Sequence, residues 1–218
     1  MIKIVKGNQP NSMIAHKKSG GNYGNMPTAT KNELRESLIN EQGYVCCYCL
    51  KRIPENKADL HHTKIEHFKC QENYAVLDLE YTNLHLACKG NEGQSEKLQT
   101  CDTAKANKDI ISFSLIDNSL NGNIHYAKDG TVFSEQDNIE KEINEILQLN
   151  NDQNIKKTRA SILKGVSESI RILQSKGRLT KNVLERELQY WQDRNNNKHR
   201  PFYPVAVQYL EKKIEKFN

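Results

Sequence analysis

The sequence predicts an α+β fold, with a small cysteine-rich core in the first half of the chain and a mostly α-helical C-terminal region. From residue 134 onward, apolar residues recur at the spacing of amphipathic helices. Ahead of them, Asp129-Gly130 separates two short runs of β-forming residues, which is typical of a β-hairpin. At 218 residues, the chain is long enough to bury a sizeable core.

Composition divides the chain into four parts. Residues 1–29 are rich in Gly, Asn, Ser and Lys, and we expect an extended arm that is either mobile or laid along another surface. Residues 30–111 contain the cysteines and form the predicted core. Residues 112–133 are expected to hold short strands and the hairpin, and residues 134–218 the helical region.

Local signals place the first elements. A helix is expected to begin near Thr30, because Thr30 and Glu33 match the capping-box pattern, and to stop at Gly43. A short strand is expected over residues 112–116, and the hairpin over residues 123–133.

Four helical patterns follow, and we expect them to pack as one bundle because their apolar faces must cover one another. Gly177 should end the second helix, Thr180 should cap the third, and Pro204 should lie in the first turn of the last. The apolar positions are Ile139, Ile143, Ile146 and Leu147; Ile155, Ile162, Val166, Ile170 and Leu173; Val183, Leu184, Leu188 and Trp191; and Val207, Leu210, Ile214 and Phe217.

Positive charge is concentrated near the C-terminus. The whole chain carries a net charge of +5, but residues 155–218 hold 15 Lys and Arg against 6 Asp and Glu, a local charge of +9. The remainder therefore carries −4. A basic region suits a polyanionic partner such as nucleic acid, although solvated faces of surface helices would give the same count.

The sequence shows no membrane or export signal. No apolar run approaches the roughly 20 residues of a membrane helix, and the first residues lack the apolar stretch of a secretory signal. We therefore expect a cytoplasmic protein with no membrane partner.

Four of the six cysteines are placed like metal ligands. Cys46 and Cys49 form a C-x-x-C unit, and Cys88 and Cys101 are the natural second pair for a tetrahedral zinc site. Twelve residues separate Cys88 from Cys101, so we expect a loop between them. The alternative is a buried or redox-active C-x-x-C pair with unrelated later cysteines. The remaining two, Cys47 and Cys70, are expected to be ordinary packing residues.

Residues suited to phosphodiester hydrolysis lie between and beside these cysteines. Hydrolysis needs a base that activates water and ligands for a divalent cation. Glu66 and His67 supply both kinds of group, Asp102 adds a carboxylate, and Asn83 is placed to tie down the intervening loop. His67 could instead be a plain core or surface histidine, and Asp102 could simply cap a helix.

Two further histidines, His61 and His62, precede Glu66 on the same expected strand. We interpret them as structural, with contact to substrate or metal as the alternative.

Taken together, these motifs resemble the HNH (ββα-metal) endonucleases. Within that class they are most similar to the PtuB-like effectors of retron and Septu anti-phage defence systems, over about residues 30–110. The matching segments are Cys46-Cys47-Tyr48-Cys49, Ile65-Glu66-His67-Phe68, Asn83-Leu84, and Cys101-Asp102-Thr103-Ala104-Lys105.

The resemblance implies a role for each matching residue. His67 corresponds to the general base, Asn83 to the residue that orients the loop and the base, and Lys105 to a trailing lysine that could contact phosphate. Glu66 and Asp102 correspond to ligands of a catalytic Mg²⁺ or Mn²⁺. The four ligand-like cysteines correspond to a structural Zn²⁺ site. The chain departs from the family in its widely spaced final cysteine pair and in having Asp at the third motif position.

The resemblance also implies partners. A PtuB-like effector would be held by a PtuA-like ATPase, and retron versions would add a reverse transcriptase and its RNA–DNA product, the msDNA. The N-terminal arm and the basic C-terminal region are candidate docking surfaces. The rival hypothesis is a non-catalytic zinc module that binds nucleic acid or a protein, and a nearer alternative is a restriction-type HNH enzyme acting alone. The sequence leaves open whether the substrate is DNA or RNA, and what triggers activity.

Overall fold

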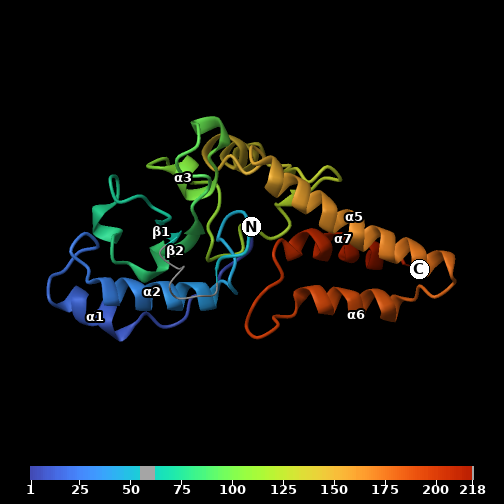
Figure 1. Cartoon of the computed structure of the whole chain (residues 1–218), viewed down its shortest axis with the longest axis horizontal. Helices are drawn as coiled ribbons and strands as arrows, with labels where there is room; N and C mark the ends of the chain where they lie inside the picture. The colour runs from blue at the N-terminus through green and yellow to red at the C-terminus, as the bar shows by residue number, and fades with distance from the viewer. Residues whose placement is uncertain (55–61, 218) are drawn as a thin grey trace.

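The computed structural model describes residues 1–54 and 62–217 and shows a mixed α+β fold, mostly helical with small antiparallel sheets. Two parts are visible in Figure 1. One contains the N-terminal helices, the first sheet and the short helix α3. The other is an elongated group of three helices, α5, α6 and α7. The predicted α+β fold class is therefore confirmed, together with a mostly helical C-terminal region.

The N-terminal segment is packed against the core. Residues 1–10 have no regular secondary structure, and helix α1 (Asn11–Lys18) follows them. The side chains of Met1, Ile4 and Met13 are buried in the main core. The Ile4 N–H also donates to the Leu115 carbonyl at 2.6 Å. Residues 1–10 are therefore laid along another surface, one of the two expected arrangements, because their apolar side chains hold them down. The expectation of an extended arm is wrong for residues 11–18, which form α1.

Helix α2 (Thr28–Glu41) starts earlier than expected. Pro27 precedes its first turn in an extended conformation, no side-chain cap is formed, and Thr30 lies buried inside the helix. The predicted capping box is therefore wrong. The expected stop at Gly43 is confirmed, since Gly43 has a φ of +60° and the Tyr44 N–H closes back onto the Ile39 carbonyl at 3.0 Å.

The first sheet consists of β1 (Thr63–His67) and β2 (Leu84–Cys88), which pair antiparallel with Ile65 opposite Leu86. Three short 3-10 turns, Ala75–Leu77, Tyr81–Asn83 and Glu96–Leu98, interrupt the connections. Helix α3 (Cys101–Lys105) follows, so the chain runs in the order β1, β2, α3.

Residues 112–116 form no strand, contrary to expectation. Side chains bind several backbone N–H groups at and just before this segment. The N–H groups of Ile111 and Ser112 donate to the Glu142 carboxylate, and the Ser114 N–H donates to Ser119 Oγ at 2.8 Å. The expected hairpin is confirmed: β3 (His125–Tyr126) pairs antiparallel with β4 (Val132–Phe133).

The C-terminal region contains α4 (Asp137–Lys141) continuing into a π-helical turn (Glu142–Ile146), then α5 (Gln153–Ser175), α6 (Lys181–Gln192) and α7 (Tyr203–Glu215). Thr180 caps α6 as expected, accepting the Val183 N–H at 3.2 Å. Pro204 lies in the first turn of α7, also as expected.

The expectation of a single helical bundle is wrong. Ile139, Ile143 and Leu147 face the main core, which also contains the cysteines, because α4 is short and folds back onto it. Helices α5, α6 and α7 share a second, smaller core. Its buried members are Val166, Ile170, Leu184, Ala206 and Leu210.

In the part of the chain that the structure describes, no helix combines the length and apolar character required to cross a membrane.

Candidate functional site

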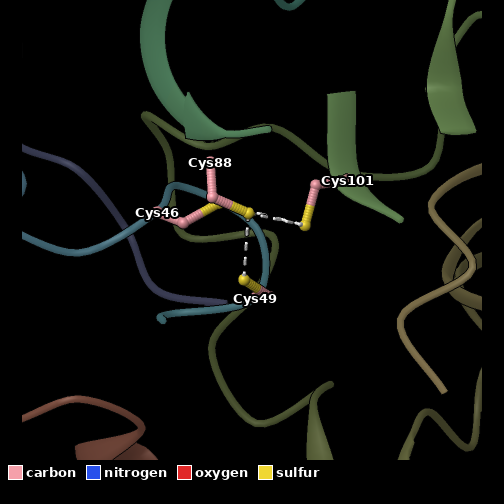
Figure 2. Close-up of side chains that lie close together, drawn as sticks. All are labelled: Cys46, Cys49, Cys88 and Cys101. Carbon is pink, nitrogen blue, oxygen red and sulfur yellow. Dashed lines mark hydrogen bonds between the residues drawn. The ribbon is translucent and has the colours of Figure 1, made fainter. Parts of the chain in front are cut away.

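Four cysteines from distant parts of the chain converge (Figure 2). The Sγ atoms of Cys46, Cys49, Cys88 and Cys101 all lie within 4.8 Å of one another. Three of the separations are 3.9 Å for Cys46–Cys101, 3.7 Å for Cys49–Cys88 and 3.8 Å for Cys88–Cys101. Cys88 is half-buried and the other three are buried.

These separations fit a metal site. Four sulfurs at about 2.3 Å from a tetrahedral Zn²⁺ lie about 3.8 Å apart, whereas a disulfide would require about 2.05 Å. The four thiols are free. Burial opposes ionisation of Cys46, but hydrogen bonds from the neighbouring thiols, first among them Cys101, bring its pKa well below the usual value, whereas the hydrogen bond with Cys46 raises the pKa of Cys101 well above it. The cluster is therefore consistent with a structural Zn²⁺ site, as the sequence predicted.

Cys46 and Cys49 lie on a tight turn. The Cys46 N–H donates to the Lys51 carbonyl at 3.0 Å, and the Leu50 N–H returns to the Cys46 carbonyl at 3.1 Å. The Lys51 N–H points at Cys49 Sγ at 3.5 Å. Leu50 adopts a φ of +66°, which turns the chain back at this point. We call residues 46–51 the cysteine knuckle.

The second pair is separated by a closed loop, as the wide spacing predicted. Cys88 ends β2 and Cys101 begins α3. Between them, Gly90 has a φ of +52°, and a Cβ there would lie 2.0 Å from the Thr100 carbonyl oxygen. The Thr100 N–H donates to the Gly90 carbonyl at 2.9 Å. This close approach brings the ends of the loop together and lets the two cysteines meet.

Cys47 and Cys70 are buried but do not belong to the cluster. Cys70 Sγ faces the Asn107 carbonyl at 3.3 Å, and the Cys47 N–H joins the knuckle to β2 through the Leu86 carbonyl at 3.1 Å.

Glu66 lies in a buried charged pair beside the knuckle. Its Oε1 accepts the Tyr48 hydroxyl at 2.7 Å and lies 2.9 Å from Lys105 Nζ. Both charged side chains are only 1% exposed. Lys105 Nζ also donates to the His67 carbonyl at 3.1 Å. The expected contact between Lys105 and phosphate has no support from this placement, because the ammonium faces inward.

Asp102 lies next to Glu66. It is the second residue of α3, and Thr100 occupies the capping position, so the interpretation of Asp102 as the helix cap is wrong. Asp102 Oδ2 is 3.4 Å from Lys64 Nζ on β1. Burial, followed by the adjacent Asp102 carboxylate, raises the pKa of Glu66 well above its usual value, despite the opposing influence of Lys105. The structure thus brings together the two carboxylates that the sequence singled out.

His67 ends β1 and is largely covered. Its Nε2 lies 3.1 Å from the Asp78 carbonyl oxygen, and the Tyr23 ring packs edge-on against the imidazole with centroids 4.5 Å apart. A carbonyl can only accept, so Nε2 carries the proton and Nδ1 keeps the lone pair. Burial lowers the pKa of His67 below its usual value.

Asn83 spans the connection between the two strands. Its Oδ1 accepts the Lys69 N–H at 2.7 Å, and its Nδ2 donates to the carbonyls of Lys69 and Leu77 at 3.0 and 3.1 Å. Because Asp78 follows Leu77 directly, these bonds also fix the carbonyl that holds His67.

The candidate residues do not all converge on one point. Glu66, Asp102 and Lys105 meet, whereas the His67 ring turns toward Asp78. Within residues 1–54 and 62–217, the four cysteines are the only group of three or more His, Cys, Asp or Glu with converging ligand atoms. His61 lies outside the described residues, and His62 is exposed just ahead of β1.

Sequence reasoning missed several contributors. Tyr48 and Tyr23 gave no signal beyond their residue type, and Asp78 acts through its backbone. Gln42 is buried and clamps the knuckle to the sheet: its side chain donates to the Val45 and Leu86 carbonyls and accepts the Leu86 N–H. A polar residue directly before Gly43 was the only hint available.

No protein-family model matches this sequence, and no curated protein matches it either. Its function is therefore inferred from the motifs and from the geometry of the site.

Proposed function

We propose that this protein is a metal-dependent endonuclease of the HNH (ββα-metal) type that hydrolyses nucleic-acid phosphodiesters. The observation that carries the proposal is the succession of β1, β2 and α3 around the cysteine cluster. The carboxylates of Glu66 and Asp102 lie next to each other, on the face of β1 that also carries Lys64. The same succession places His67 at the end of β1, with one ring nitrogen fixed by a backbone carbonyl.

Glu66 and Asp102 are the residues that would hold the catalytic cation. Carboxylate oxygens suit Mg²⁺ or Mn²⁺, and Mg²⁺ is commonly held by only one or two carboxylates together with water and substrate phosphates. The Tyr48 hydroxyl and the Lys105 ammonium both contact Oε1 of Glu66. When bound, the cation would neutralise charge on the phosphate and on the leaving oxygen.

His67 would act as the general base. Its Nε2–H is engaged by the Asp78 carbonyl, so Nδ1 is the atom that would accept a proton from water. The lowered pKa of His67 keeps the imidazole neutral near pH 7, as a base must be. Asn83 supports this role indirectly, because its amide fixes the loop that carries Asp78.

The cysteine cluster would hold Zn²⁺ in a structural role. Four cysteine sulfurs would fill all four positions of a tetrahedral Zn²⁺, so none would be open for water or substrate. Its contribution to the proposed activity is to join the knuckle, β2 and α3 at one point.

We further propose that the protein is the effector of an anti-phage defence system, held by a PtuA-like ATPase and, in a retron setting, by a reverse transcriptase with its msDNA. This part rests on the resemblance of the motifs. The charge of +9 over residues 155–218 is compatible with a nucleic-acid partner, DNA or RNA.

A non-catalytic zinc module that binds nucleic acid or a protein is the second candidate function. One observation favours it: Glu66 already has a buried counter-ion in Lys105, so the carboxylate has no need of a metal to balance its charge. In such a module the Glu66–Lys105 pair would be purely structural.

A cleavage assay separates the two functions. Zinc-loaded protein would be incubated with Mg²⁺ and panels of double-stranded DNA, single-stranded DNA and RNA. The variants are His67→Ala and, as a matched control, His125→Ala on the distant β3. Zinc content would be measured in every sample, and each assay repeated with the partner ATPase added.

Cleavage by wild type and His125→Ala, together with loss of at least about 100-fold in His67→Ala, would agree with general-base catalysis. Equal cleavage by His67→Ala would remove the base assignment. Nucleic-acid binding without cleavage in every sample, with the ATPase present and zinc bound, would favour the binding module.

A further inference from the structure

Tyr48 links the cysteine cluster to the carboxylate pair. The residue lies inside the knuckle, directly before the ligand-like Cys49, and its side chain is fully buried. Its hydroxyl donates to Glu66 Oε1 at 2.7 Å. A single side chain therefore spans from the turn that presents two cysteines to the acid proposed to bind the catalytic cation.

The hydroxyl restricts how Glu66 can rotate. Oε1 receives the Tyr48 hydroxyl and the Lys105 ammonium together, at 2.7 and 2.9 Å. A carboxylate with one oxygen held from two directions has its plane fixed, and its second oxygen must point away from both donors. Lys105 is also tied to the His67 carbonyl at 3.1 Å. Glu66 is thereby held in a single orientation beside Asp102.

The position of Tyr48 depends in turn on the knuckle. Its neighbours in sequence are fixed on both sides: the Cys47 N–H bonds to the Leu86 carbonyl, and Cys49 Sγ lies in the cluster. The buried side chain of Gln42 adds bonds from the residue before the knuckle to β2. If the cysteines separated, the turn and the hydroxyl would move with them.

We propose that Tyr48 is a positioning residue that makes divalent-cation binding at Glu66 and Asp102 depend on an intact cysteine site. This inference rests on the proposed nuclease function. In this proposal, zinc affects the reaction in two ways. It stabilises the fold, and through Tyr48 it also sets the orientation of the Glu66 carboxylate. Residues that orient metal ligands in this way commonly change metal affinity by about 10- to 100-fold when removed.

The chain offers a matched control for the loss of a buried phenol. Tyr81 is also buried, and its hydroxyl also donates to a glutamate, Glu41 Oε1. Neither Tyr81 nor Glu41 belongs to the carboxylate pair or the cysteine cluster. Tyr81→Phe therefore removes the same group from an equivalent bond elsewhere in the core.

The test is Mn²⁺ binding to zinc-loaded protein, followed by the electron paramagnetic resonance signal of free Mn²⁺. Wild type, Tyr48→Phe, Tyr81→Phe and Glu66→Gln would be compared, with zinc content measured in each. We expect Tyr48→Phe to bind Mn²⁺ about 10- to 100-fold more weakly than wild type at an unchanged zinc content. Tyr81→Phe should bind as wild type does, and Glu66→Gln should lose binding.

Each other outcome is decisive. Unchanged Mn²⁺ affinity in Tyr48→Phe, with Glu66→Gln still defective, would overturn the positioning role and leave the proposed nuclease site intact. Loss of zinc in Tyr48→Phe would also overturn it, because the hydroxyl would then serve the cysteine site itself. Absence of Mn²⁺ binding in wild type, or equal binding in Glu66→Gln, would instead contradict the proposed cation site.

Discussion

The cysteine core and the three-helix end of the molecule are stabilised in different ways. In the core, four thiols meet and a buried Glu66–Lys105 pair lies beside them. In the other part, α5, α6 and α7 cover an apolar interior, and charged pairs such as Arg171–Glu168 lie on the surface. In Figure 1 the group of α5, α6 and α7 extends away from the N-terminal helices, although Ile155 on α5 and Val205 on α7 still pack in the main core.

This difference assigns separate roles to the two regions. Buried charges cost free energy unless they are paired, and a four-thiol cluster repels itself once ionised unless a cation is bound. A region built this way depends on its paired charges and on its thiol cluster, whereas the helical end needs only matching apolar faces. The core is therefore where a single substitution should have the largest effect.

The largest effect should come from breaking the cysteine cluster. Cys46→Ser removes one of four sulfurs, and structural zinc sites in small domains contribute roughly 10–16 kcal/mol of binding free energy. We expect loss of zinc, by elemental analysis, and loss of the cooperative thermal transition of the core. Cys70→Ser is the control, because this buried thiol lies outside the cluster and its bond to the Asn107 carbonyl suits a hydroxyl. Equal zinc loss in both variants would contradict the assignment of ligands.

The next effect concerns the buried ion pair. Lys105→Met leaves Glu66 buried without its cation, and breaking such a pair costs about 3–5 kcal/mol. Chemical denaturation should show a drop of this size in the free energy of unfolding. Arg171→Met in the exposed pair on α5 should leave that quantity nearly unchanged, since water screens both charges. A similar drop in the free energy of unfolding for both variants would contradict the difference between the buried pair of the core and the exposed pair of the helical end.

A somewhat smaller effect is expected in the helical end. Leu210 on α7 is fully buried in the second core, and Leu→Ala at such sites costs about 2–5 kcal/mol. We expect Leu210→Ala to lower the thermal stability of α5, α6 and α7 while zinc content stays at the wild-type level. Loss of zinc in this variant would mean that the two parts do not behave as separate regions.

The smallest effect concerns the junction between the two parts. The His199 N–H donates to the Gly43 carbonyl, and burial, with Arg194 and Arg52 nearby, lowers the pKa of His199 from 6.5 to about 4. Between pH 6.5 and 4 the unfolded chain binds more protons at this residue than the folded chain does. The stabilising contribution of His199 to the free energy of unfolding should therefore be complete above pH 6.5 and be lost as the pH drops through this window. The full shift corresponds to about 3.4 kcal/mol, and screening by solvent near this ring reduces the expected fall to about 2 kcal/mol.

His199→Gln removes this titration and should flatten that part of the pH profile. The measurement is chemical denaturation at a series of pH values for both proteins. An identical slope in the variant would show that His199 does not carry the dependence.

The sequence correctly predicted those features that depend on a single helix or turn. Thr180, Gly43 and Pro204 act through the backbone of their own helix, and each does what its residue type predicted. The spacing of the cysteines also predicted the cluster, because a metal site needs particular residue types at particular spacings. Helix α1 carried no such signal, since only Met13 of its residues is buried.

What escaped prediction depends on contacts between distant segments. Lys105 was expected to contact phosphate, and only the fold places its ammonium beside Glu66 of β1. The strand expected at residues 112–116 does not form, and Glu142, thirty residues away, binds the Ser112 N–H at its start. Tyr48 appeared only as the residue inside a C-x-x-C unit, and its bond to Glu66 required the fold itself.

The most direct test of this comparison is hydrogen exchange measured by mass spectrometry before and after removal of zinc with a chelator. We predict that protection of the amide hydrogens from exchange is lost in the knuckle, β1, β2 and α3. It should be retained in α6, α7 and the part of α5 that packs on them. Uniform loss along the whole chain, or unchanged protection in the knuckle and the first sheet, would contradict it.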